Sequence, residues 1–473
     1  MLQSSNRHDG EIAAKPTVAL LPCAELIEDF LDHVDISFET FCKEFVGSWM
    51  FGYINALQTA GVQTVLLCIS ADVTQPSRFI HAPTGATICV LPAPRLYRAY
   101  RRSRRKILNS IGTSEETVRE NLNNIDAQSS HYSSLLGVLK NTFKSFWSYL
   151  STPLGTLRRE LCSLDCAAII CQEYEYPRFD ACTFLGWRMK LPVFATFQGG
   201  DKIQSFLEYP PRRVAFRACT GLIIATQSEI QRVHDRYAVP KDKIARIFNP
   251  VDAASWYAID QSEARVALGI PQSAKVVVYH GRIDMYRKGL DILLDAWVEI
   301  CRDRPEKDLR LLLVGTGPDA DKLHQRITAM QLKGVMWLDK FVSDRSVIQR
   351  YLCAADVYTL PSRQEGFPVA PIEAMSCGLP VVAADAPGVR DILEGGEISG
   401  GLVVPREDAT ALALAIGRVL DDEAWGRELG IRARCRAQSC FSPEIVGKQL
   451  RDVLLNPSLQ KTSNITNLSH ASQ

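Results

Sequence analysis

The sequence predicts an α/β protein with two doubly wound domains that face each other across a cleft. Short β-branched runs alternate with longer amphipathic segments, which is typical of parallel sheets covered by helices. The runs contain few polar residues, as strands buried on both faces do. This alternation of strands and helices is interrupted by an Asn-Pro turn at Asn249 and then begins again. A chain of 473 residues is long enough for two such domains.

The first series predicts a domain over residues 16–252, preceded by a disordered tail at 1–15. Its expected strands lie at 17–23, 62–70, 86–92, 166–172, 191–197 and 220–226. Amphipathic segments fill the intervals between them. One such segment ends at Gly61, a residue type that commonly closes helices.

The second series predicts a domain over residues 253–440. Its expected strands lie at 275–281, 309–317, 335–341, 356–362 and 380–386. Ser442 and Pro443 are a good cap and first residue for one last helix, which we place at 441–456. The polar segment 457–473 is expected to be a disordered tail.

Composition excludes several classes of protein. Apolar residues make up 46% of the chain and charged residues 23%, and the net charge of +1 gives no overall field that favours nucleic acid. The fourteen cysteines are scattered through apolar segments without close CxxC pairs, which favours free thiols in a reducing compartment over zinc sites. The polar N-terminus does not fit a signal peptide, and no apolar run approaches the roughly 18 residues of a membrane span. We therefore expect a cytoplasmic protein.

Ligands of open α/β sheets bind at the carboxyl ends of strands, so the loops there are the first candidates for a site. After the expected strand 275–281, Arg282 and Lys288 come just before a helix, where two cations could hold a diphosphate or simply be solvated. The glycine-rich loop 314–319 could admit a flat ligand or be only a tight turn.

A third loop contains the stretch PSRQEGFPVAPIEAMSCG at 361–378. Glu365 precedes Gly366, and Glu373 follows in the first turn of a predicted helix that contains Pro371. The helix dipole favours a negative charge at the position of Glu373. It gives no reason for a second acid at Glu365, which indicates a binding or catalytic role.

These residues resemble the signature of the retaining GT-B glycosyltransferases of family 4 (group 1), in which seven residues separate two glutamates. The resemblance covers the second domain strongly and the first more loosely, through FQGGD at 197–201, SEIQRVHDRY at 228–237 and IFNPVD at 247–252. It implies the GT-B fold, which consists of two Rossmann-like domains and a C-terminal helix that crosses back to the first.

The resemblance also implies roles for individual residues. Arg282 and Lys288 would hold the diphosphate of the donor and neutralise the leaving group. Glu365 would face the donor sugar as a catalytic residue, and Glu373 would bind the ribose hydroxyls. The remaining expected donor-binding positions are Gly281, Gly315, Phe341, Val342, Gly366, Phe367 and Pro368.

On the acceptor side, the resemblance points to Gly47, Gln198 and Asp201. Many relatives have a histidine where this chain has Gln198, and glutamine can hydrogen-bond a hydroxyl but cannot become charged. An acidic insert at 24–45 precedes Gly47, where relatives have a glycine loop directly after the first strand. His280 is expected to be a strand residue and not a catalyst.

The implied function is retaining transfer of a hexosyl unit from a UDP- or GDP-linked sugar to a glycan, lipid-linked or small-molecule acceptor in polysaccharide or glycolipid biosynthesis. No cofactor and no metal are expected, because the cationic side chains take the place of Mg²⁺. Two alternatives stay open: a sugar-nucleotide epimerase, and a non-catalytic protein that binds nucleotide sugars. A glycoside hydrolase fits less well, because it needs no phosphate-binding cations beside its acids.

Residues 95–150 combine a strongly basic segment with a segment rich in Phe, Trp and Tyr. Such a combination suits peripheral docking on an anionic membrane, where lipid-linked acceptors are found. The simpler interpretation is a solvated basic helix beside an ordinary core-facing helix.

Overall fold

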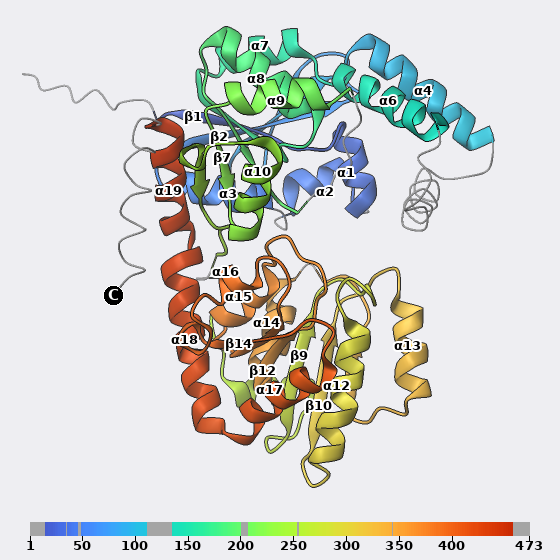
Figure 1. Ribbon diagram of the computed structural model, residues 1–473, viewed down its shortest axis with the longest axis vertical. Helices are drawn as coiled ribbons and strands as arrows, with labels where there is room; N and C mark the ends of the chain where they lie inside the picture. Colours follow the sequence, from blue (N-terminus) through green and yellow to red (C-terminus); the bar gives the residue numbers. More distant parts are fainter. Residues whose placement is uncertain are drawn as a thin grey trace, which may run out of the picture.

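The computed structural model describes residues 15–34, 36–45, 49–110, 135–199, 207–252, 255–342 and 344–456. They form two α/β domains, one drawn in blue to green and the other in yellow to red (Figure 1). The expected tails at 1–15 and 457–473 lie outside the described residues, apart from Lys15.

The first sheet has eight strands in the order β3-β4-β2-β1-β5-β6-β7-β8. All neighbours are parallel except the β3–β4 pair, which is antiparallel. The strands are β1 Thr17–Leu21, β2 Gln63–Ser70, β3 Ser77–Ile80, β4 Thr87–Pro92, β5 Cys166–Gln172, β6 Val193–Thr196, β7 Gly221–Ile224 and β8 Ile244–Arg246.

Helices cover both faces of this sheet. They are α1 Ile27–Val34, α2 Phe38–Lys43, α3 Trp49–Thr59, α4 Arg95–Ser110, α6 Leu135–Leu150, α7 Leu154–Ser163, α8 Pro177–Met189, α9 Tyr209–Ala218 and α10 Gln227–Tyr237. In β1, Val18 and Leu20 pack towards α1 to α3, whereas Ala19 and Leu21 pack towards α7 to α10. This alternation follows from the two-residue period of a strand and explains why β1 is apolar throughout.

The second sheet has six parallel strands in the order β11-β10-β9-β12-β13-β14. They are β9 Lys275–His280, β10 Leu309–Val314, β11 Val335–Leu338, β12 Val357–Leu360, β13 Val381–Ala384 and β14 Gly401–Val404. The strand order reverses between β9 and β12. Their carboxyl ends therefore flank the crevice where ligands of doubly wound sheets bind.

The helices of this domain include α11 Gln261–Leu268, α12 Leu290–Asp303, α13 Ala320–Ala329, α14 Arg345–Ala354, α15 Ala370–Ser376, α16 Val389–Ile392 and α17 Ala409–Asp421. Short 3₁₀ turns occupy Lys241–Lys243 and Gly396–Ser399.

The last two helices of the described residues are α18 Glu423–Phe441 and α19 Pro443–Leu455, and α19 crosses back to the first domain (Figure 1). Val446, Leu450 and Leu454 of α19 belong to the same apolar core as α3. A β-carbon at Gly447 would lie 1.8 Å from the Ala56 carbonyl oxygen, so this glycine permits the close helix contact.

These findings confirm the predicted architecture of two doubly wound α/β domains with a C-terminal helix that crosses back to the first. The predicted strand segments all contain strands, but β3, β8 and β14 were not predicted. All three lie at the edges of their sheets and are only partly buried, so they need not contain the continuous buried apolar run by which the other strands were recognised.

All fourteen cysteines are free thiols, as the sequence indicates. Within the described residues, no helix combines the length and apolarity that crossing a bilayer requires.

Candidate active site

The loops that follow β9 and β12 meet at the point where the strand order reverses. Lys288 lies in the first of these loops and Glu365 in the second, and the Lys288 Nζ donates to the Glu365 Oε1 across 2.7 Å. The Glu365 side chain is 8% exposed and that of Lys288 is 25% exposed. The structure thus brings together two residues that the sequence analysis assigned to one site.

Backbone packing explains why these two loops meet. Gly289 has φ +63°, and a β-carbon there would lie 2.1 Å from the Pro361 carbonyl oxygen at the end of β12. The backbone N–H groups of Arg363 and Gln364 donate to the Arg287 carbonyl oxygen at 2.9 Å and 3.3 Å. These contacts hold the start of α12 against the loop after β12. Lys288 is therefore positioned to face Glu365.

Arg363 strengthens the same junction, and the sequence analysis did not single it out. Its guanidinium donates to both carboxylate oxygens of Asp291 at 2.7 Å, to Glu407 at 2.8 Å and to the Tyr286 carbonyl oxygen. Burial alone would raise the pKa of Asp291, but the bonds from Arg363 hold it below its ordinary value. Arg363 is a positioning residue for the loop that contains Glu365.

Arg282 lies two residues after the end of β9, and its side chain is exposed. The Tyr279 hydroxyl donates to the Arg282 carbonyl oxygen at 2.9 Å, which fixes the backbone there. Burial raises the pKa of Tyr279, and the nearby charge of Glu365 raises it further. Tyr279 thus contacts the backbone of Arg282 and lies near Glu365, whereas the charge of Arg282 acts on Asp319. The predicted place of the Arg282 side chain in the site stays a prediction.

Glu373 lies in the first turn of α15, as predicted, and has a partner that the sequence analysis treated as an ordinary strand residue. His280 ends β9, and its Nε2 lies 2.8 Å from the Glu373 Oε2. A carboxylate only accepts, so Nε2 carries the proton of this bond. Burial raises the pKa of Tyr358, and the nearby Tyr279, Glu365 and Glu373 add to the shift.

Gly281 and Gly315 pack backbone to backbone at the ends of β9 and β10. Gly315 has φ +129°, and a β-carbon there would lie 2.1 Å from the Gly281 carbonyl oxygen. Glycine is therefore required for the loops to approach each other, whatever contact they make with a donor. Their predicted role in donor binding stays a prediction.

The first domain approaches this site through Gly199, one residue after Gln198. A β-carbon at Gly366 would lie 2.8 Å from the Gly199 Cα, and one at Gly388 would lie 2.5 Å from the Gly366 carbonyl oxygen. The three glycines thus bring the β6 loop, the Glu365 loop and the start of α16 into direct contact.

The side chain of Gln198 is hydrogen-bonded to the side chain of Asn249. The Gln198 amide donates to Asn249 Oδ1 at 3.1 Å, and the Asn249 amide donates to Gln198 Oε1 at 2.8 Å. The Gln198 backbone N–H donates to Glu173 at 2.8 Å. Both residues of this amide pair lie on loops that face the second domain, and no sequence signal pointed to Asn249 as the partner.

The other predicted positions are spread around this centre. Phe367 is buried and stacks on Phe248 with ring centroids 5.5 Å apart, and Pro368 is also buried. Phe341 is 73% exposed after β11, and Val342 follows it. Gly47 and Asp201 lie outside the described residues.

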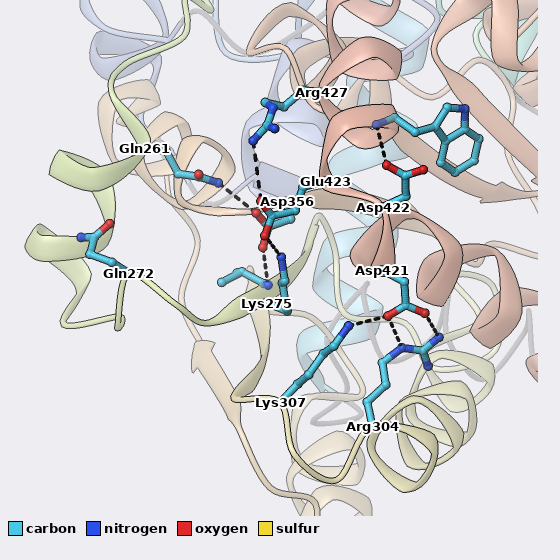
Figure 2. A network of polar contacts seen from close by, with 12 residues as sticks. Gln261, Gln272, Lys275, Arg304, Lys307, Asp356, Asp421, Asp422, Glu423 and Arg427 are labelled. Carbon is cyan, nitrogen blue, oxygen red and sulfur yellow. Dashed lines mark hydrogen bonds and ion pairs between the residues drawn. The ribbon is translucent and has the colours of Figure 1, made fainter.

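A hollow of about 260 Å³ lies at the opposite, amino-terminal edge of the second sheet, where β9 begins. Its charged side chains bind one another: Arg265 pairs with Asp356, and Lys275 and Arg427 pair with Glu423 (Figure 2). The hollow is far along the strands from Lys288 and Glu365, so it is not part of this site.

Residues 274–422 match the family model described as "Glycosyl transferases group 1". A D-inositol 3-phosphate glycosyltransferase from Kineococcus radiotolerans is 32% identical over 235 residues, which are 47% of this chain and 54% of that protein. The chain therefore spans about half the length of the curated relatives that it matches.

Two solved structures resemble the whole chain. Sucrose-phosphate synthase from Thermosynechococcus elongatus has a TM-score of 0.61 at 20% identity and covers 97% of this chain and 100% of its own. The Anabaena protein HepE, crystallised with UDP, has a TM-score of 0.64 at 16% identity and covers 93% and 99%. At these identities the likeness shows the fold.

Proposed function

We propose that this chain, which has the GT-B fold and whose second domain belongs to the group 1 glycosyltransferases, transfers a glycosyl unit from a nucleotide sugar to an acceptor hydroxyl. The observation that carries the proposal is the Lys288–Glu365 pair at the reversal of the second sheet. A cation for phosphate and an acid for sugar hydroxyls stand side by side there. An epimerase or a glycoside hydrolase gives no comparable reason for this pairing.

Arg282 and Lys288 bind the diphosphate of the donor. Lys288 is neutralised by Glu365 in the free protein, and a diphosphate offers it a second anion within reach. When the bond between the anomeric carbon and the phosphate oxygen breaks, its electrons pass to the diphosphate. The two cations stabilise the charge that develops there, which lowers the barrier.

Glu365 faces the donor sugar, and Glu373 binds the ribose. Glu365 orients the hydroxyls of the sugar and stabilises the positive charge that grows at the anomeric carbon. Glu373 accepts hydrogen bonds from the ribose hydroxyls while His280 holds its other oxygen. His280 therefore acts as a positioning residue for nucleotide binding.

The proposed reaction retains the anomeric configuration and needs no metal. The acceptor oxygen attacks from the face that the diphosphate leaves, and the acceptor proton passes to a phosphate oxygen. The positive charge that a metal would supply comes from Arg282 and Lys288. We propose a UDP- or GDP-linked hexose as donor and a glycan, lipid-linked or small-molecule hydroxyl as acceptor; the UDP in the HepE complex supports the first of these nucleotides.

Gln198 is proposed to contact the donor sugar or the acceptor from the first domain. Its amide is engaged with Asn249, so the pair presents hydrogen-bonding groups without a charge. Gly47 and Asp201 are proposed to contact the acceptor together with Gln198.

Screening nucleotide sugars by thermal shift tests the donor, because a ligand that binds only the folded protein raises its Tm. The donor that binds is then incubated with candidate acceptors, with and without EDTA. We expect release of UDP or GDP, unchanged by EDTA, and a product of unchanged anomeric configuration by NMR. Binding without release identifies a sensor, and conversion of the nucleotide sugar without release identifies an epimerase; either result overturns the proposal.

A further inference from the structure

Four helices of the first domain share an unusual charge balance. α4, α6, α8 and α9 contain fourteen Lys and Arg residues but a single acid, Asp180. Subtracting this surplus of thirteen from the net charge of +1 leaves −12 for the rest of the chain. The near-neutral net charge of the chain therefore conceals a surplus of positive charge on these four helices.

Contacts among these helices show that they form one layer, in the half of the first domain that lies away from the second domain (Figure 1). Tyr100 of α4 stacks on Trp147 of α6 with ring centroids 4.1 Å apart. Tyr149 of α6 donates to Asp180 of α8 at 2.6 Å, and Arg212 of α9 donates to the same carboxylate at 2.6 Å. These contacts link α4 to α6, α6 to α8 and α8 to α9, so four separate segments of the sequence form one layer.

The only acid of the layer does not reach its surface. The side chains of Asp180 and Arg212 are 5% and 0% exposed, so their charges cancel inside the protein. Arg178 is also buried and binds backbone carbonyl groups, including that of Glu25 at 2.8 Å. The surface of the layer is left with cations, of which six are exposed: Arg95, Arg102, Lys144, Arg188, Arg213 and Arg217.

Within the described part of the chain, none of the exposed arginines in this set makes an ion pair with an acid. Large apolar side chains stand among them on all four helices: Leu96, Phe143, Phe146, Phe184, Trp187 and Val214. Single exposed apolar residues are common on proteins, and the second domain has some. Some of those lie beside acids, as Ile398 lies beside Glu397 and Val298 beside Glu299.

We infer that this layer is a docking surface for an anionic lipid bilayer. Its cations match the negative surface potential of such a membrane, and its aromatic and aliphatic side chains can enter the interface between headgroups and acyl chains. A nucleic acid would use the same charges but would leave Leu96, Phe143 and Val214 in water. The inference enlarges the basic segment 95–150 with α8 and α9, and it does not depend on glycosyl transfer.

Co-sedimentation of the full chain with vesicles tests the inference. We expect binding to vesicles that contain phosphatidylglycerol, little binding to vesicles of phosphatidylcholine alone, and loss of binding at high salt, where charges are screened. The charge reversal Arg102→Glu/Arg188→Glu/Arg213→Glu should weaken the partition by about tenfold or more, because each cation near an anionic surface contributes. The apolar variant Phe143→Ser/Phe146→Ser/Trp187→Ser should weaken it while leaving the salt dependence in place.

Matched changes on the second domain serve as controls. Ile398→Ser/Ile431→Ser removes two exposed apolar side chains, and Arg427→Glu reverses an exposed cation; both should bind vesicles as the parent does. Circular dichroism confirms that each variant is folded. Equal binding to both vesicle types, unaltered binding of the layer variants, or binding to heparin but not to vesicles would overturn the inference. Nucleotide release measured without vesicles keeps this outcome separate from the proposed activity.

Discussion

Gly199 of the first domain and Gly366 of the second lie so close that a β-carbon on Gly366 would stand 2.8 Å from the Gly199 Cα. The β6 loop and the Glu365 loop therefore touch in this structure. Further along the same junction, Asp391 of α16 accepts hydrogen bonds from the Gln227 backbone N–H and from Arg246, both at 2.9 Å. The two domains are thus closed over the edge of the candidate active site.

The glycine contact predicts that Gly366→Ala damages the closed state. The added methyl group meets backbone and not a flexible side chain, so the loops must separate, and overpacking of this kind costs about 1–3 kcal/mol. We expect a fall of about ten- to a hundredfold in kcat/KM for the transfer reaction. Gly155→Ala is the control, because nothing lies within 4 Å of its β-carbon. Parent-like kinetics for Gly366→Ala would show that closure at this contact is unimportant.

The Lys288–Glu365 pair predicts that replacing either side chain by alanine changes donor binding and turnover in different ways. Glu365→Ala should bind the donor but lose about a hundredfold or more in kcat, because it removes stabilisation needed in the transition state. Lys288→Ala should weaken both donor binding and turnover. Calorimetry of donor binding and steady-state kinetics measure the two effects. Lys307→Ala, on the opposite edge of the sheet, should change neither, and retained activity in Glu365→Ala would remove its catalytic assignment.

The His280–Glu373 bond predicts a defect in donor binding. His280→Ala deletes a hydrogen bond to a carboxylate, which contributes about 1.5–3 kcal/mol, so the donor KM should rise about tenfold or more. His280→Gln can offer an N–H from a similar position and should restore part of the affinity. kcat should change less than KM. A selective loss of kcat would contradict the role of His280 as a positioning residue for the ribose site.

Asp421 predicts a stability difference that depends on pH. Hydrogen bonds from Arg304 and then Lys307 lower its pKa to about 2, although burial opposes the shift (Figure 2). Because the folded pKa lies below the ordinary aspartate pKa of 3.8, the stabilisation is complete above that pH and is lost as the pH falls towards 2. The side chain is 46% exposed, so Asp421→Asn should cost only about 0.5–1 kcal/mol near neutrality.

Urea unfolding across this pH range measures the Asp421 effect. The difference between Asp421→Asn and the parent should shrink as the pH approaches 3 and should persist unchanged between about 5 and 7. Asp242→Asn on an exposed turn is the control. If the difference in unfolding free energy between the parent and Asp421→Asn grew on acidification, Asp421 would not have a lowered pKa.

The sequence alone determined the local features of this protein. Period-two apolar runs predicted the main strands, turn residues such as Pro371 and Gly378 placed a helix start and end, and the spacing of Glu365 and Glu373 indicated the site. Each of these signals depends on residues a few positions apart, which is the range over which backbone geometry acts. The edge strands β3 and β8 were not predicted, because each contains exposed polar residues and no continuous apolar run.

Only the tertiary structure decided which residues meet. Lys288 reaches Glu365 because β9 pairs with β12 and Gly289 admits the Pro361 carbonyl group, and Gln198 reaches Asn249 because their loops face the same cleft. The cationic layer likewise unites α4, α6, α8 and α9 from distant segments around one buried acid, Asp180. Contacts of this kind depend on strand order and helix packing, and neither is encoded in any single stretch of the chain.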